Sequence, residues 1–146
     1  MPIRDVQSEI ITALIARLAD IQPVEEGDVR TLLDADDAGL PDEFIVLQPG
    51  TVDEVAGQHP RMPNSLREQV VISVVLVSKK RQYAAGLRAT RLAVKVSTAG
   101  MKCGLEGVGG VQSAGFQQET PVPPGEGRRW AAHVMPLQIT YVQPLK

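Results

Sequence analysis

The residue types that most often do chemistry in proteins are few in this sequence, and they stand apart from one another. Cys103, His59 and His133 lie far apart in the chain, without the short paired spacing of a zinc or other metal site. No G-x-S-x-G motif is present to position a serine nucleophile. A Cys103–His dyad that forms only in the folded chain is the remaining alternative. The sequence favours packing or interface roles for these residues, so we expect no catalytic residue, no metal site, no cofactor and a protein that is not an enzyme.

Two loops superficially resemble ligand-binding motifs. Residues 104–110 are glycine-rich, but they lack the Gly-Lys-Ser/Thr ending of a P-loop and follow an expected helix rather than a strand. Residues 34–39 are acidic, but a calcium loop that began at Asp34 would place Ala38 and Ile45 at two ligand positions. The sequence therefore predicts an ordinary glycine-rich loop and a solvated acidic loop.

Basic residues cluster at two places that could meet an anionic partner. Lys79, Lys80 and Arg81 follow a long apolar stretch, and Arg128 and Arg129 precede the last apolar stretch. The simplest interpretation is that both clusters are solvated turns at strand ends. The alternative is that they face an acidic protein surface or phosphate, for example DNA that passes through a ring. The chain has only five aromatic residues, so base stacking is not available as a general mode of nucleic-acid binding.

The elements that would position these residues belong to one domain, residues 1–146, because the chain has the length of a typical single domain. The net charge of −2 gives no global attraction to nucleic acid or to an anionic membrane. One cysteine cannot form an internal disulfide, and the N-terminus lacks the apolar core of a signal peptide. No apolar run approaches the roughly 20 residues of a membrane span. We expect a product that is assembled in the cytoplasm, without membrane contact.

Two segments have helical periodicity. Residues 3–18 place apolar side chains at helical spacing, with Asp5 as the expected N-cap, and Pro23 prevents the helix from continuing. Residues 83–98 predict a second helix that ends before Gly100. One side of this second helix carries Ala85, Ala89, Leu92, Ala93 and Val96.

The stretch from residue 66 to residue 78 predicts a long strand with an unusual pattern. One face carries Leu66, Val70, Ile72, Val74 and Leu76, and the other carries Val71, Val75 and Val77 among polar residues. A strand that is apolar on both faces must be covered on both faces, either by a helix of the same chain or by a neighbouring subunit. At about 3.3 Å per residue the strand would be about 40 Å long. A domain of this size has a radius of gyration of about 15 Å, so one end of the strand should project.

The remaining segments predict shorter elements. Residues 43–48 form a strand closed by Pro49-Gly50, and residues 51–64 form a long loop. Residues 111–119 and 130–142 form further strands, and Pro136 marks an edge or a bulge in the last one. The fold class predicted from this order is α+β, a mostly antiparallel sheet of about four strands with two helices packed on it. Residues 28–33 fit either a short strand or a helical turn.

This order of elements resembles the phage tail terminators, the family of lambda U-like and Mu-like tail terminator proteins. The residues that carry the resemblance are the helix pattern around Ile10-Ile11-x-x-Leu14-Ile15-x-Arg17-Leu18, the strand Phe44-Ile45-Val46-Leu47, the long strand at residues 66–77, the helix at residues 83–98 and the closing strand Leu137-Gln138-Ile139-Thr140-Tyr141-Val142. The resemblance covers nearly the whole chain, and it rests on the arrangement rather than on any single motif. The loop at residues 49–65 is longer than expected for the family.

The resemblance implies a homohexameric ring in the virion tail that caps the head-proximal end of the tail tube, stops tube polymerisation and offers a surface to the head. Its partners would be copies of itself, the tail tube protein and the connector proteins of the neck. Identical subunits that join head to tail form closed rings when the rotation permits. The residues we expect at the interface with another subunit or with tube protein are Val71, Val75, Val77, Lys79, Lys80, Arg81, Arg128 and Arg129.

Two alternatives stay open at the level of sequence. The chain could be another neck, connector or minor tail protein, which has similar size and patterning. It could also be a small α+β enzyme or ligand-binding domain, which would require a deep pocket with perturbed ionisable groups.

Overall fold

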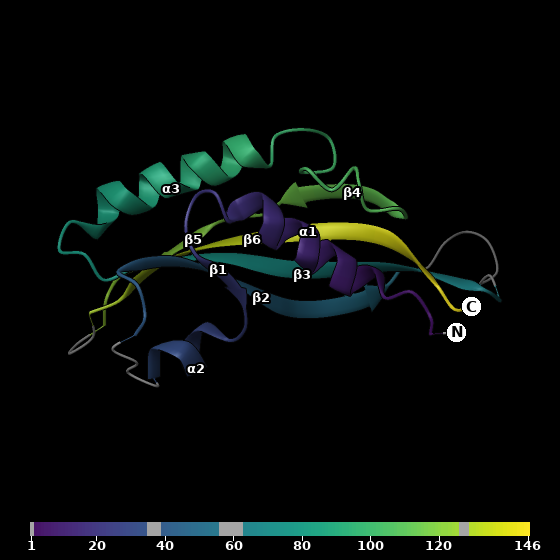
Figure 1. The fold of residues 1–146 in the computed structure, drawn as a ribbon, viewed down its shortest axis with the longest axis horizontal. Helices are drawn as coiled ribbons and strands as arrows, with labels where there is room; N and C mark the ends of the chain where they lie inside the picture. Colours follow the sequence, from purple (N-terminus) through teal and green to yellow (C-terminus); the bar gives the residue numbers. More distant parts are fainter. Residues whose placement is uncertain (1, 35–38, 56–62, 126–128) are drawn as a thin grey trace.

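The computed structural model describes residues 2–34, 39–55, 63–125 and 129–146. Within them the chain forms one mixed sheet of six strands and three helices (Figure 1). The elements in chain order are α1 Val6–Leu18, β1 Val24–Glu26, α2 Val29–Asp34, β2 Glu43–Glu54, β3 Ser65–Ser78, α3 Tyr83–Ser97, β4 Val111–Phe116, β5 Thr120–Val122 and β6 Ala131–Pro144.

The predicted fold class of about four antiparallel strands and two helices is wrong. The sheet has the order β1-β2-β3-β6-β4, with β5 on the same edge of β6 as β4, and β1 runs parallel to β2. The elements outside the predicted count are short: β1 and β5 have three residues each, and α2 has six. Segments of this length contain fewer than two periods of a strand or helix pattern, which is too little to predict them, and tertiary pairing decides their conformation. The sequence of residues 28–33 fits either a short strand or a helical turn, and α2 shows that the helical alternative is correct.

Strand β2 also runs further than expected. It continues through Pro49-Gly50 to Glu54, and its pairing with β3 shifts between Pro49 and Val52. A bulge of this kind absorbs the proline while the pairing resumes beyond it. The expected loop at residues 51–64 is therefore strand at its start, and residues 56–62 lie outside the described residues.

The long strand predicted around residues 66–78 is confirmed as β3, which lies at the centre of the sheet between β2 and β6. The strands β2, β3 and β6 run along the length of the molecule, and β3 begins beyond the ends of α1 and β4 (Figure 1). The two long predicted helices are confirmed as α1 and α3, and Asp5 caps α1 by accepting a hydrogen bond from the Ser8 amide at 3.2 Å.

The two faces of the sheet carry two separate cores. Helices α1 and α3 cover one face, where Ile72, Leu76, Leu137 and Tyr141 belong to the main core (Figure 1). Burial there raises the pKa of Tyr141 to about 12. Helix α2 lies on the opposite face, where a smaller core contains Phe44, Val46, Val75 and Val77 with Trp130 packed against them.

Candidate interaction surface

The apolar second face of β3 is covered only in part by the chain itself. Val75 and Val77 are 2% and 1% exposed, because the smaller core under α2 encloses them. Val71 lies further along the same face, outside that core, and is half-buried. Of the three valines expected at an interface, only Val71 therefore offers surface to a partner, and its predicted contact with another subunit stays a prediction.

The basic turn after β3 is largely neutralised by neighbouring acids. Lys79 Nζ lies 3.3 Å from Asp42 Oδ1 and 5.3 Å from the centre of the Trp130 ring. Lys80 Nζ lies 2.9 Å from Glu43 Oε1, and this hydrogen-bonded pair raises the pKa of Lys80. The third member, Arg81, is exposed. The turn as a whole is a weaker anion site than three consecutive cations suggest.

The second basic cluster is described only at Arg129, which is exposed just before β6. Arg128 lies outside the described residues, as does His59.

Glu119 is the centre of a network that sequence reasoning missed. Its carboxylate accepts hydrogen bonds from Arg91 Nε at 2.5 Å and from Arg91 Nη2 at 3.2 Å, and it pairs with Lys95 Nζ at 3.2 Å and His133 Nε2 at 2.8 Å. Chiefly because of Arg91, the pKa of Glu119 falls to about 2. Lys95 also lies 4.1 Å above the Phe116 ring. The network joins α3 to β6, and no sequence signal marks it because its members meet only in the fold.

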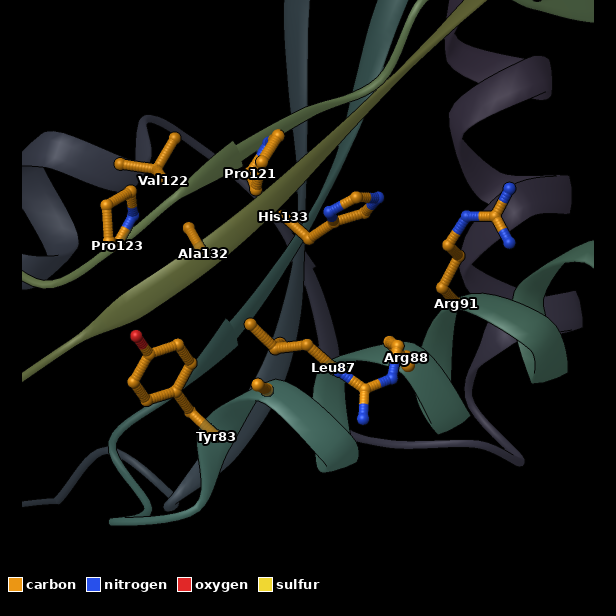
Figure 2. Close-up of a pocket in the computed structure, with 10 residues that line it drawn as sticks. Tyr83, Leu87, Arg88, Arg91, Pro121, Val122, Pro123, Ala132 and His133 are labelled. Carbon is orange, nitrogen blue, oxygen red and sulfur yellow. The ribbon is translucent and has the colours of Figure 1, made fainter.

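A groove of about 370 Å³ opens between α3 and the edge strand β5. Its walls are mostly apolar, with Tyr83 and Leu87 from α3 facing Val122 and Ala132 from the strands (Figure 2). Arg91 and His133 also line it, but both are already paired with Glu119. The groove can therefore hold an apolar side chain, with Arg91 and His133 paired within the chain and Arg88 at its wall.

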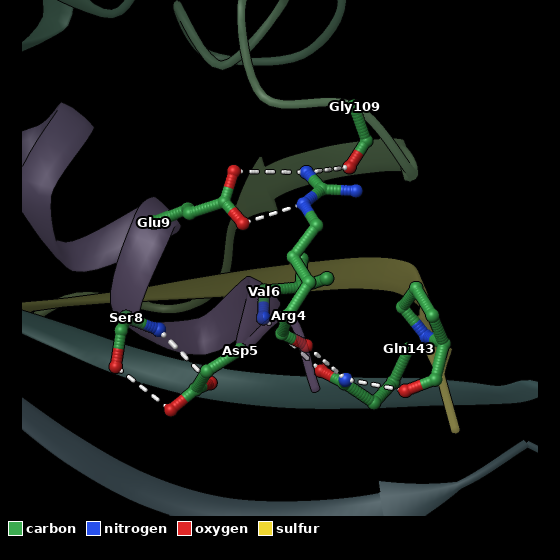
Figure 3. Close-up of polar contacts among 8 residues, drawn as sticks. Arg4, Asp5, Val6, Ser8, Glu9, Gly109 and Gln143 are labelled. Carbon is green, nitrogen blue, oxygen red and sulfur yellow. Dashed lines mark hydrogen bonds and ion pairs between the residues drawn. The ribbon is translucent and has the colours of Figure 1, made fainter. Parts of the chain in front are cut away.

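The N-terminal segment is held against the last strand and the glycine-rich loop. Arg4 donates to Glu9 Oε2 at 2.5 Å and to the Gly109 carbonyl at 2.6 Å, and Gln143 joins the Arg4 carbonyl to the Val6 amide (Figure 3). The backbone of Gly110 has φ of 95° and passes close to the Val142 carbonyl. Glycine at this position therefore allows the loop backbone to lie close to β6, which is a structural role.

The remaining sequence candidates for chemistry occupy structural positions. Cys103 is buried, and burial raises the pKa of its thiol, so the reactive thiolate is disfavoured. Among the described residues no cluster of three histidine, cysteine or carboxylate groups is arranged to hold a metal ion. In the same part of the chain, no helix has the length and apolar character needed to cross a membrane.

Helix α3 carries an apolar stripe on its outside. The stripe consists of Ala85, Ala89, Leu92 and Val96, all of which are exposed; Leu92 is 58% and Val96 77% exposed. The side of α3 that packs on the sheet carries Leu87, Thr90 and Val94 instead. The apolar side predicted from the sequence therefore exists, but most of it faces solvent. We call these four residues the outer stripe.

A second hollow lies on the other side of α1. It has a volume of about 330 Å³ and lies between α1 and the strands β1, β2 and β3. Its apolar lining includes Ile11, Ile15 and Ile72, and polar groups are contributed by Ser8, Asp5 and Glu26. We call this hollow the α1 groove.

The sequence matches no family model, and the search of curated proteins finds no relative.

Proposed function

We propose that this chain is a non-enzymatic structural subunit of a phage tail, and that it is the terminator of the tail tube. In this role it assembles in the host cytoplasm as a ring, most simply a hexamer, at the head-proximal end of the tube. The ring stops tube polymerisation and presents a surface to the neck proteins. The resemblance of the element order to lambda U-like and Mu-like terminators motivates the choice of role.

The observation that carries the proposal is the outer stripe of α3. An amphipathic helix in a monomeric protein turns its apolar side to the core, because burial of a leucine or valine side chain stabilises by about 1.5–3 kcal/mol. Here Leu92 and Val96 point outward in the isolated chain. An apolar patch rimmed by charge is typical of a surface that binds another protein.

The partial cover of β3 supports the same proposal. Val71 lies on an open part of the second face, and β3 projects beyond the helices at one end of the molecule (Figure 1). A subunit of a ring or tube needs two different surfaces, one for each neighbour, and a third for the next layer. The outer stripe and the projecting part of the sheet are separate surfaces that could serve these contacts.

The test is to add the purified protein to tube protein during polymerisation and to measure tube lengths by electron microscopy. A terminator should stop growth at one end and be found there by gold labelling. Tubes of unchanged length that carry no protein would overturn the proposal. Binding along the tube or at the distal end would indicate another tail component. A variant with Val71→Lys should cap less well, and Arg30→Glu, an exposed change on α2, is the control.

A further inference from the structure

The outer stripe has the spacing of a helix that packs against a partner. Ala85, Ala89, Leu92 and Val96 are separated by steps of four, three and four residues, so they lie along one line of the helix surface. The small residues at one end allow close approach, and the larger ones at the other end project. The stripe is suited to enter a hollow rather than to meet a flat surface.

The charge around the stripe indicates what kind of partner it meets. Helix α3 contains Arg88, Arg91 and Lys95 and no acidic residue. Arg91 and Lys95 are paired with Glu119, whereas Arg88 is exposed and has no ion-pair partner among the described residues. Two copies of α3 face to face would bring like charges together, which disfavours a symmetric pair. An acidic surface complements the stripe.

The same chain carries acidic groups beside the α1 groove. Residues 20–54 contain eleven acidic side chains and one basic side chain, whereas residues 61–102 contain nine basic and one acidic. Of the acidic side chains, Asp42 and Glu43 are already paired with Lys79 and Lys80. The acidic segment includes β1, where the side chains of Glu25 and Glu26 are exposed and form no ion pair in the part of the chain that the structure describes. Glu26 and Asp5 line the α1 groove, whose mixed polar and apolar lining includes Ile15.

The stripe and the groove are far enough apart to act in different contacts. Helix α1 meets α3 through Arg17, whose guanidinium donates to the Ser97 carbonyl at 2.8 Å. At 100° per residue, Arg17 lies on the opposite side of α1 from Ser8 and Ile15, which line the groove. A chain cannot place its own outer stripe in its own groove, but a second copy can.

We infer that the outer stripe of one copy docks into the α1 groove of the next copy, with Arg88 beside Glu26. The contact is heterologous, so each copy uses both surfaces and the association proceeds head to tail until a ring closes. This inference rests on the proposed function only in that both require self-association. The inference specifies which two surfaces meet in that self-association. It also excludes a two-fold symmetric contact between two copies of α3.

The first experiment is a charge swap, measured by sedimentation of each protein over a range of concentrations. Arg88→Glu and Glu26→Lys should each weaken self-association at least tenfold, because each places like charges at the contact. The double variant and an equal mixture of the two single variants should both recover association to within a few-fold of the wild type. Arg30→Glu and Glu106→Lys make the same charge changes at exposed positions elsewhere and should leave association unchanged.

The second experiment captures weak contacts by disulfide formation under mild oxidation. Leu92→Cys and Thr12→Cys place thiols on the outer stripe and on the wall of the α1 groove. Mixing the two variants should give dimers, and Leu92→Cys alone should give none above the wild-type background from buried Cys103. Dimers of Leu92→Cys alone would overturn the inference, as would no cross-links in the mixture or no recovery in the charge swap.

The outcomes separate the inference from the proposed function. If the wild type caps tubes and self-associates but the charge swap has no effect, the docking inference fails and the tail function stands. If the charge swap changes self-association as expected but tube length is unchanged, the docking inference is supported and the terminator role fails.

Discussion

Glu119 pairs with three side chains at once, and its role is to fix α3 on the sheet. It lies between a helix and a strand and pairs with Arg91, Lys95 and His133 at the same time. Its low pKa measures how strongly the folded chain prefers the carboxylate, so its contribution to stability depends on pH. A structural role of this kind differs from that of a general acid, whose pKa must lie near the working pH.

Replacing Glu119 by glutamine should lower the free energy of unfolding by about 1–2 kcal/mol at pH 7, allowing for solvent screening of the ion pairs. The folded pKa of about 2 lies below the ordinary value of 4.5. The difference in the free energy of unfolding between the wild type and Glu119→Gln is therefore complete above pH 4.5. It disappears as the pH falls toward 2. Urea unfolding followed by Trp130 fluorescence at several pH values measures this difference. Glu106→Gln, at an exposed site, is the control, and equal stabilities at pH 7 would contradict the prediction.

Gly110→Ala should destabilise the chain by about 1–3 kcal/mol, because a left-handed backbone at this position suits only glycine. Its φ is 95°, and an added Cβ would lie 2.9 Å from the Val142 carbonyl oxygen. Gly107→Ala is a matched control in the same loop, since nothing lies within 4 Å of its added Cβ. In thermal unfolding, the midpoint temperature should fall clearly for Gly110→Ala and change little for Gly107→Ala.

At the scale of elements, α3 is a helix with two different apolar sides. Leu87 and Val94 face the sheet, while Leu92 and Val96 face outward. The inner side stabilises the fold, and the outer side is available for assembly. The two properties should therefore separate by mutation.

Leu92→Gln should leave the free energy of unfolding within about 0.5 kcal/mol of the wild type, since it is a surface change in the isolated chain. The same change at Leu87, which is 8% exposed, should cost about 2 kcal/mol or more because it buries a polar group and loses apolar contacts. Self-association should weaken in Leu92→Gln under conditions where the monomer is fully folded. Chemical unfolding and sedimentation on the same samples provide both readouts, and a large stability loss in Leu92→Gln would contradict the assignment of the two sides.

Sequence patterning predicted the long elements of this chain well and the short ones poorly. The periodicity of α1 and the alternation of β3 extend over enough residues to be read without tertiary information. Strands β1 and β5 depend on pairing with a longer strand, and the continuation of β2 past Pro49 depends on a bulge. The interface valines illustrate the same limit, because sequence shows that Val75 and Val77 need a cover but not that α2 and Trp130 supply it.

At the scale of the whole molecule, the chain has an acidic region and a basic region in spite of a net charge of only −2. The acidic segment runs through β1, α2 and β2, and the basic segment includes the turn after β3 and helix α3. Part of this charge is paired within the chain, since Asp42 and Glu43 neutralise Lys79 and Lys80. The exposed charges that remain, such as Arg88 and Glu26, are the ones that can favour association between copies.

Head-to-tail association should weaken as salt is raised, because the Debye length falls from about 10 Å at 0.1 M to about 3 Å at 1 M. We expect a loss of several-fold in the association constant between low and high salt, without complete dissociation, since the outer stripe is apolar. Light scattering over a salt series measures this. Association that strengthens steadily with salt would indicate a contact without the Arg88–Glu26 pairing.

The hydrogen bonds that join Gln143 to Arg4 and Val6 affect the order in which the chain folds during synthesis. Strand β3 at the centre of the sheet pairs along its full length with β6, and the start of α1 is anchored by a residue 137 positions later. Contacts between such distant parts of a chain form slowly. On the ribosome the hydrogen bond between the Val6 amide and Gln143 cannot form until β6 has emerged, so the start of α1 is anchored late. A nascent chain stalled before β6 should therefore be a target for chaperones and proteases.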